Sequence, residues 1–208
     1  MTDPNFEIEA QRLSLTFFDP SNDSHCDFLV ELYNAPEILA TNGGIAPPIG
    51  DREAARKILT GEQDERLRSG DMYGKYLVTL KSPPPSDNDT PSLALHQYGE
   101  KIGIVTLNLR KGQNSFTVPE IGYWFLKKGR GRGYATEATG ALMKYLEEEK
   151  GQRELFGFCN PDNKASKGVL KRLGFEARGI ATLKTFGGIV GAVWARPGMN
   201  EDLSVYGV

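Results

Sequence analysis

The 208-residue sequence predicts a single α/β domain. Segments in which apolar and polar residues alternate, as in strands, are interleaved with segments in which apolar residues recur at helical spacing. A chain of this length suits one domain that buries enough surface to fold without disulfides or metals. The composition is that of an ordinary globular protein, with 39% hydrophobic and 25% charged residues.

Composition also argues against several classes of protein. No apolar run approaches the roughly 18 residues that a membrane-spanning helix needs, and residues 1–4 lack the start of a signal peptide. Cys26 and Cys159 are too few for a disulfide framework and lack metal-ligand spacing, which predicts a reducing, cytoplasmic location and no metal site. The net charge of −2 argues against a nucleic-acid partner, because such binding needs many Lys and Arg residues.

The N-terminal half is expected to contain alternating strands over residues 12–18, 73–80 and 101–109. Between the first and the second, apolar residues recur at helical spacing after Ser24, a plausible N-cap, and again after Asp51, so two helices are expected there. Residues 82–92 are rich in turn formers and carry no apolar side chain. They predict a disordered, solvated insertion in one loop of the sheet.

The C-terminal half is expected to alternate strand and helix before a closing hairpin. The predicted elements are a strand over 118–126, a helix over 133–150, a strand over 154–159, a helix from Asn160 to Gly174, and hairpin strands over 175–185 and 189–196. Residues 198–208 follow as a polar tail.

A stretch rich in glycine and arginine, residues 129–137, lies between a predicted strand and a predicted helix. Amides at a helix N-terminus lack internal partners, and the helix dipole adds roughly half a positive charge there, so phosphate oxygens bind readily. Arg130 and Arg132 raise the local positive charge, which suits a diphosphate. The dinucleotide motif fails because it requires glycine at Tyr134 or Thr136, and no Walker motif occurs.

The stretch contains Arg130-x-x-Gly133-x-Ala135, and Asn163-x-x-Ser166 precedes a Leu-Gly-Phe sequence at residues 173–175. These motifs resemble, in order and spacing, those of GNAT acetyltransferases of the RimJ/RimL type, and the resemblance covers roughly residues 8–197. It implies one GNAT domain with a mixed, strongly bent sheet flanked by helices. It also implies transfer of an acetyl group from acetyl-CoA to a primary amine, such as a protein N-terminus, by direct attack through a tetrahedral intermediate.

The resemblance also implies where acetyl-CoA binds. It would lie where the strand over 118–126 splays from the strand over 154–159, with main-chain groups pairing with the pantetheine arm and loop amides binding the diphosphate. The residues expected to bind it are Phe125, Leu126, Arg130, Gly131, Arg132, Gly133, Tyr134, Ala135 and Asn163.

Two residues are candidates for proton transfer. Ser166 matches the position that protonates the departing thiolate in the family, although a serine at a helix start is often only a local hydrogen-bonding group. Glu120 is the candidate base for the amine, directly or through water, and the alternative is a solvated carboxylate at a strand edge. Residues 179–200 contain no Asp or Glu, which favours Glu120.

Two alternatives stay open at this stage. The chain could be a non-catalytic acyl-CoA-binding module that senses or scaffolds, although the intact loop and Ser166 argue against this. A longer acyl donor is the second alternative, and the volume near Trp124 and Phe125 would decide it. Neither the identity of the acceptor amine nor the oligomeric state follows from the sequence.

Overall fold

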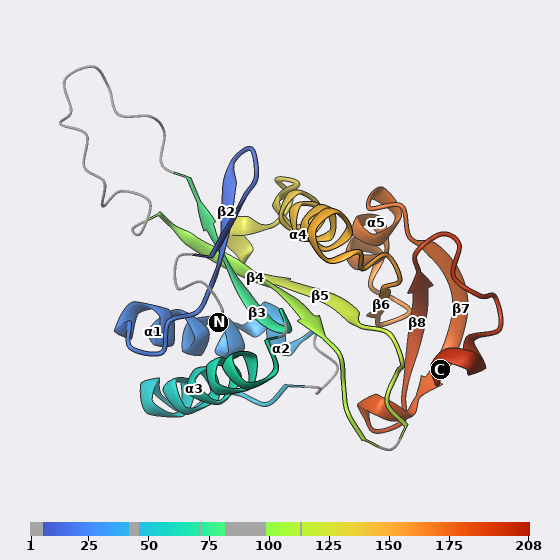
Figure 1. Cartoon of the computed structure of the whole chain (residues 1–208). Coiled ribbons are helices and arrows are strands. Elements are labelled where there is room, and N and C mark those ends of the chain that lie inside the picture. Colours follow the sequence, from blue (N-terminus) through green and yellow to red (C-terminus); the bar gives the residue numbers. More distant parts are fainter. Residues whose placement is uncertain (1–5, 42–45, 71, 82–98, 113) are drawn as a thin grey trace.

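An eight-stranded mixed sheet forms the centre of the computed structural model, which describes residues 6–41, 46–70, 72–81, 99–112 and 114–208 (Figure 1). The strand order is β1-β2-β3-β4-β5-β6-β8-β7; β5 and β6 pair in parallel, and the other neighbours pair antiparallel. The strands are β1 (Glu7–Glu9), β2 (Leu13–Phe17), β3 (Gly74–Leu80), β4 (Lys101–Asn108), β5 (Glu120–Phe125), β6 (Phe156–Cys159), β7 (Glu176–Leu183) and β8 (Ile189–Ala195).

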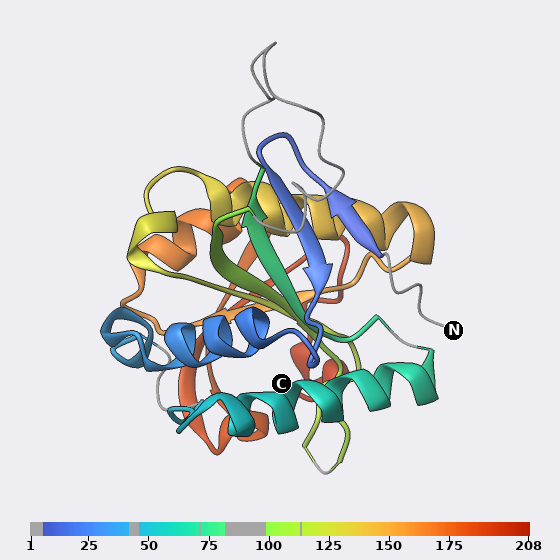
Figure 2. The same ribbon diagram turned by 90° about the vertical axis from the view of Figure 1, so that its left-hand side faces the viewer.

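Helices cover both faces of this sheet (Figures 1 and 2). On one face lie α1 (Asp23–Asn34), α2 (Pro36–Leu39) and α3 (Arg52–Ser69), and on the other lie α4 (Tyr134–Lys150) and α5 (Lys164–Arg172). Three short 3-10 helices complete the described elements: η2 (Lys127–Gly129), η3 (Lys184–Phe186) and η4 (Leu203–Tyr206). The predicted fold, a mixed sheet flanked by helices, is confirmed.

Strand β5 contributes side chains to both hydrophobic layers because successive residues of a strand point to opposite faces. Ile121 and Phe125 pack with Leu142 in the core beneath α4. Trp124 packs on the other face, where its ring meets Tyr33 of α1 edge-on, with centroids 5.0 Å apart. Neighbouring residues of β5 therefore place their side chains on opposite sides of the sheet.

The helix starts differ in detail from the sequence expectation. Asn22, not Ser24, is the N-cap of α1, and its Oδ1 accepts a hydrogen bond from the Ser24 amide at 3.0 Å. Helix α5 begins at Lys164 because Asn160 forms a turn first, accepting from the Asp162 amide at 2.8 Å. Strand β1 and the one-turn helix α2 are too short to give a periodic signal. The predicted insertion at residues 82–92 lies outside the described residues.

The C-terminal segment is not the polar tail that the sequence suggested. Met199 and Tyr206 are buried and pack in one cluster with Phe156 of β6. The Tyr206 hydroxyl also donates a hydrogen bond to the Glu154 carboxylate at 2.9 Å. Met199 and Tyr206 are isolated apolar residues among polar neighbours and show no periodicity. The sequence pattern therefore did not indicate that this segment covers the end of the sheet.

Candidate functional site

The parallel strands β5 and β6 separate after a short paired stretch. Their register pairs Glu120 with Phe156 and Ile121 with Gly157, and no later pair joins them, although β5 runs on to Phe125. On its other edge β5 stays paired with β4 as far as Phe125. The structure thus opens the sheet at the place where the sequence predicted a splay.

Alternation of main-chain groups along β5 decides which of them face the opening. The Leu126 amide donates to the Ile102 carbonyl of β4 at 3.0 Å, and the Leu126 carbonyl accepts from Gly129 at 2.8 Å. The main-chain groups of Tyr123 and Phe125 consequently point the other way, toward β6. Leu126 was expected to offer main-chain groups to a ligand beside Phe125, but its own groups are engaged by the fold.

The loop between β5 and α4 ends in a helix N-terminus whose cap carries no side chain. Gly131 and Gly133 both have positive φ, +75° and +80°, which a β-branched residue rarely adopts. Gly133 is the N-cap of α4 and has no side-chain cap hydrogen bond. The first-turn amides of Tyr134 and Ala135 therefore receive no hydrogen bond from a cap side chain, an arrangement that suits anion binding at a helix N-terminus.

Arg12, the residue directly before β2, holds this loop in place. Arg12 donates from its amide and its Nε to the two Glu137 carboxylate oxygens at 2.6 and 2.7 Å, and from Nη2 to the Arg132 carbonyl at 3.2 Å. Its guanidinium also lies over the Tyr134 ring, 4.6 Å from the centroid. Glu137, in the first turn of α4, thereby links the helix start to a distant strand. No local sequence signal indicates this pair.

The two arginines of the loop lie in different settings. Arg130 donates from Nε to the Phe125 carbonyl at 2.8 Å and from Nη2 to the Glu37 carbonyl at 3.2 Å, so its side chain ties the loop to the end of β5 and to α2. Arg132 is exposed, and its guanidinium has no hydrogen bond or ion pair with any described residue. Of the two, Arg132 is the cation available to a phosphate.

Ser166 faces the α4 side of the opening from the first turn of α5. Its amide donates to Asn163 Oδ1 at 2.9 Å, so Asn163 caps the helix, and its hydroxyl lies 2.9 Å from the Tyr123 hydroxyl. The Tyr123 hydroxyl also donates to the Ser166 carbonyl at 3.0 Å. Cys159 lies beyond the last β5–β6 pair with its thiol near Ser166, and burial raises the pKa of that thiol. Tyr123 thus packs against the core beneath α4 and also contacts the Ser166 hydroxyl.

Glu120 lies on the opposite face of the sheet from Ser166. It is buried, 6% exposed, so the alternative of a solvated carboxylate at a strand edge is wrong. Arg110 contacts Glu120 Oε1 from Nε at 2.9 Å and from Nη2 at 2.8 Å. Burial raises the pKa of Glu120, and the hydrogen bonds and charge of Arg110 partly oppose that rise. Glu120 Oε2 is buried and has no hydrogen-bond partner among the described residues.

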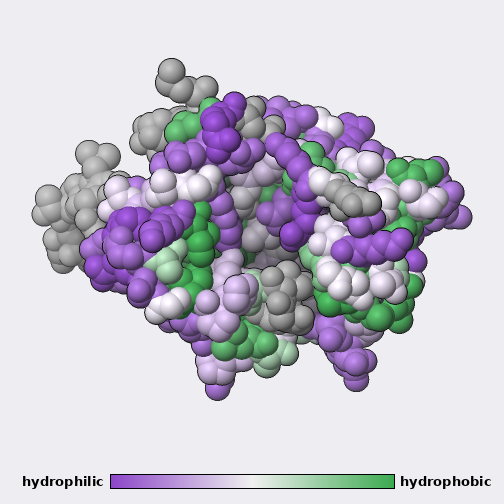
Figure 3. Space-filling view, turned by 90° about the horizontal axis from the view of Figure 1, so that it is seen from below, coloured by the Kyte–Doolittle hydropathy of each residue, from purple (hydrophilic) through white to green (hydrophobic). Residues whose placement is uncertain are grey.

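The surface on the α1–α3 side is hollowed between those helices and the β7–β8 hairpin (Figure 3). Trp124 packs on this side of the sheet and Glu120 shares its face of β5, while Ser166 contacts Tyr123 on the other side. Over the described residues, no three His, Cys, Asp or Glu side chains gather in a way that could hold a metal ion. Every helix in those ranges is too short or too polar to cross a bilayer.

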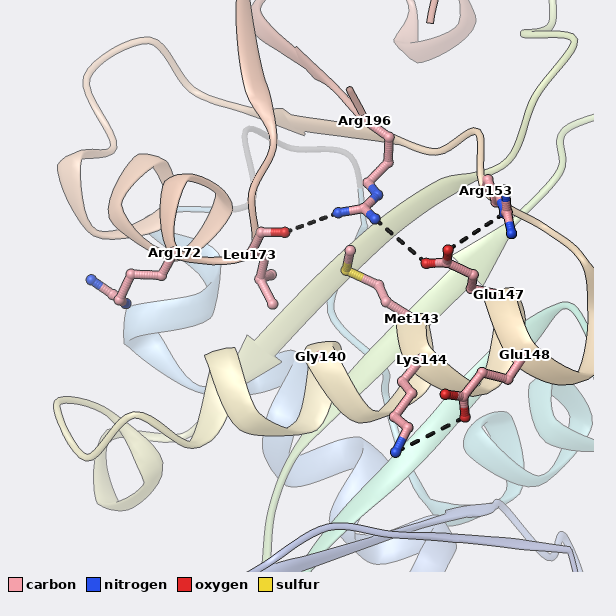
Figure 4. Close-up of a pocket in the computed structure, with 9 residues that line it drawn as sticks. All are labelled: Gly140, Met143, Lys144, Glu147, Glu148, Arg153, Arg172, Leu173 and Arg196. Atoms are coloured by element: carbon pink, nitrogen blue, oxygen red, sulfur yellow. Dashed lines mark hydrogen bonds and ion pairs between the residues drawn. The ribbon is translucent and has the colours of Figure 1, made fainter. Parts of the chain in front are cut away.

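A separate pocket of about 710 Å³ lies over the outer face of α4, bordered by the end of α5 and by Arg153 and Arg196 (Figure 4). Its charged groups are largely paired: Glu147 meets Arg153 at 3.4 Å and Arg196 at 3.7 Å, and Arg196 also donates to the Leu173 carbonyl. At its rim Arg172 donates to Thr136 Oγ1 at 3.2 Å, in the first turn of α4. Of the residues that line this pocket, only Arg172 brings a charge close to the loop between β5 and α4.

Comparisons with known proteins agree with this geometry. Residues 12–176 match the family described as the acetyltransferase (GNAT) domain. The solved structure of RimL, a ribosomal L7/L12 alpha-N-protein acetyltransferase in complex with coenzyme A, superposes with a TM-score of 0.67 over 92% of this chain and 97% of that chain, at 21% identity. At that identity the likeness shows the fold.

Two curated bacterial relatives match part of the chain. YkkB of Bacillus subtilis is 40% identical over 78 residues, and the [Ribosomal protein uS5]-alanine N-acetyltransferase of Escherichia coli is 34% identical over 83 residues. These matches cover 38% and 39% of this chain and 45% and 42% of the relatives, so less than half of each relative's length is matched. Because the family match spans most of the sequence and the fold agrees with it, the chain belongs to the GNAT family of acetyltransferases.

Proposed function

We propose that this protein is an acetyl-CoA-dependent N-acetyltransferase. The observation that carries the proposal is the junction of two features: strands β5 and β6 part after Ile121, and the loop that leaves β5 ends at a helix N-terminus without a side-chain cap. The first feature offers main-chain groups to an extended amide-containing arm, and the second offers amides to a diphosphate. Acetyl-CoA contains both parts in that order.

The residues present fit this ligand in a specific way. The amides of the loop up to Ala135, with the Arg132 guanidinium, would hold the diphosphate. The Tyr123 main chain and the Phe125 amide would pair with the pantetheine arm, because the Phe125 carbonyl already accepts from Arg130. Asn163 uses its Oδ1 as the helix cap, so its contact with the arm would come from Nδ2.

The two candidate proton carriers lie on the two sides of the opening, as the reaction requires. Glu120, on the α1–α3 side, would take a proton from the incoming ammonium, and the neutral nitrogen would attack the thioester carbon directly. As the C–N bond forms and the C–S bond breaks, the Ser166 hydroxyl would give its proton to the thiolate. A main-chain amide of β5 would polarise the carbonyl through the tetrahedral intermediate. The nitrogen would release its surplus proton to water, water would reprotonate the Ser166 oxygen, and Glu120 would return its proton to solvent. The products are the amide, the free thiol and the one proton that the ammonium brought.

The acceptor that suits this site best is an α-amine. Its pKa of about 7.7 to 8.0 leaves a substantial neutral fraction near pH 7, whereas a lysine with a pKa of about 10.4 is almost wholly protonated. A single carboxylate therefore suffices for an α-amine. Two relatives are named for alanine acetylation of a ribosomal protein and for α-N-protein acetylation, which supports the same choice. Because both cysteines are free thiols, we place the enzyme in the reducing cytoplasm.

The proposal is tested with acetyl-CoA and a panel of short peptides that differ only in their amines. The panel contains free N-termini beginning with alanine or serine, the same peptides with blocked N-termini, and blocked peptides that carry lysine. Mass spectrometry of the products should show one added acetyl group on the free N-termini and none on the fully blocked peptides. A preference for lysine would contradict the choice of acceptor.

Glu120→Gln should slow acetylation of an α-amine most below about pH 7.5 and least near pH 9, where the amine loses its proton without help. The initial rate at saturating acetyl-CoA measures this. Glu176→Gln is the matched control, since Glu176 also begins a strand and also meets an arginine, Arg178, at 2.8 Å. An equal loss at every pH would count against a base role for Glu120.

Acetyl-CoA should protect Cys159 from alkylation. Cys159 is half-buried beside Ser166, where the reacting sulfur is expected, so an occupied site should slow its reaction with N-ethylmaleimide roughly tenfold or more. Cys26, which is fully buried, serves as the internal reference in the same sample. Peptide mass spectrometry over a time course gives both rates. If acetyl-CoA binds but leaves the Cys159 rate unchanged, the ligand does not occupy the opening.

A further inference from the structure

The two oxygens of the Glu120 carboxylate have different surroundings. Oε1 accepts a hydrogen bond from Arg110 Nε at 2.9 Å and lies 2.8 Å from Arg110 Nη2 in an ion pair, while Oε2 is buried without a hydrogen-bond partner among the described residues. A buried carboxylate oxygen that lacks a donor is costly, so a fold retains it most readily where a ligand supplies one. The nitrogen of an amine substrate is a donor of the required kind.

Arg110 is itself fixed from the other side. Its guanidinium lies over the ring of Phe186, 4.6 Å from the centroid. Phe186 belongs to η3, in the turn between β7 and β8, and packs against Phe116 and Phe158 with centroids 5.8 and 5.6 Å away. Although the Arg110 side chain is 37% exposed, a cation over an aromatic face is attracted to it and keeps its orientation. The β7–β8 hairpin thus orients Arg110, and Arg110 in turn orients the Glu120 carboxylate.

The remaining neighbours of Glu120 explain why this arginine matters. Asn108, its cross-strand neighbour on β4, is uncharged, and Phe156, its neighbour on β6, is apolar. Arg110 is the only charged group that acts on Glu120 within the described part of the chain. Removing that charge would leave burial to favour the protonated carboxyl.

We propose that Arg110 is a positioning residue for the acetyl transfer: it binds one oxygen of Glu120 and so presents the other, Oε2, to the amine of the substrate. This rests on the proposed function of Glu120 as the base. Arg110 touches neither substrate in this scheme and acts only through Glu120. Its fork of donors places both Nε and Nη2 against Oε1, which the single ammonium of lysine cannot do.

The test is the pH profile of kcat at saturating acetyl-CoA and acceptor peptide. In Arg110→Met the acid limb should move to higher pH by about one unit or more, because the pKa of Glu120 rises when the neighbouring positive charge is lost. In Arg110→Lys the limb should stay near that of the wild type, while kcat falls because the fork is lost. Arg178→Met, which removes the arginine from the Arg178–Glu176 pair, should move neither.

A double variant tests the role of Arg110 separately from the role of Glu120 as the base. In a Glu120→Gln background, Arg110→Met should add no further change to the pH profile, since the group through which it acts is gone. If Glu120→Gln lowers the rate but Arg110→Met alone leaves the acid limb of the pH profile unchanged, the role of Arg110 is overturned, while Glu120 remains the base. If Glu120→Gln has no effect at any pH, the base assignment itself fails. Should Arg110→Met fold poorly, Phe186→Leu should shift the limb in the same direction by less.

Discussion

Gly133→Val should abolish measurable acetyl-CoA binding, with an affinity loss of at least about 100-fold. Gly133 has φ +80° at the N-cap of α4, and a β-branched residue at positive φ is a steric outlier, so the backbone must leave the shape that points its amides outward. Each charge-assisted hydrogen bond to a phosphate contributes about 1.5–3 kcal/mol, and losing two of them accounts for the predicted loss. Isothermal titration calorimetry measures it.

The other end of the same helix supplies the control. Gly151, the C-cap of α4, has φ +66° with no atom within 4 Å of an added Cβ, so Gly151→Val imposes a similar strain away from the loop. It should lose a comparable amount of stability, on the order of 1–2 kcal/mol, and keep its acetyl-CoA affinity. S-acetylpantetheine, which lacks the diphosphate, should bind Gly133→Val and wild type alike. Equal acetyl-CoA affinity in a folded Gly133→Val variant would falsify the role of the loop.

Ser166→Ala should lower kcat by about 100-fold while the affinity for acetyl-CoA changes by less than about twofold. Proton donation to a departing thiolate is made only in the transition state, so its loss reduces turnover and not ground-state binding. The hydroxyl is placed for this by the Tyr123 hydroxyl at 2.9 Å and by the Asn163 cap on its amide. Steady-state kinetics and calorimetry on the same preparation separate the two effects.

Ser24 allows the alternative, a purely local role for Ser166, to be tested. Ser24 also lies in the first turn of a helix, and its amide also donates to the Oδ1 of an asparagine cap, at 3.0 Å. If the Ser166 hydroxyl were only a local hydrogen-bonding group at the helix start, Ser24→Ala and Ser166→Ala would have similar, small effects on stability and none on kcat. Unchanged turnover in Ser166→Ala would return this serine to that local role.

The local motifs could be read from the sequence because each lies within one turn or loop. The loop glycines, at every second position from 129 to 133, predicted a backbone suited to an anion. The cap was placed less well, since the sequence started the helix at Asn160, whereas Asn163 caps α5. Periodicity likewise located the long helices and the strands that became β3 and β4.

The contacts between distant segments could not be predicted this way. Arg12 and Glu137 are 125 positions apart, and only the pairing of β2 with the sheet beneath α4 brings them together. The same holds for Tyr123 with Ser166 across the opening. Sequence alone also treated Arg130 as a phosphate ligand, whereas the fold uses its side chain to tie the loop to β5. Such pairs depend on strand order, which a pattern of single residues does not contain.

The central claim, that the chain catalyses acetyl transfer and does not only bind an acyl-CoA, is tested most directly by counting turnovers. A peptide with a free N-terminus is incubated with excess acetyl-CoA and a trace of protein, and mass spectrometry gives the ratio of acetylated peptide to protein. We expect many acetylated peptide molecules for each protein molecule, and a rate reduced about 100-fold in Ser166→Ala. Tight acetyl-CoA binding without acetylated product, on any amine of the panel, would contradict it and favour a binding module.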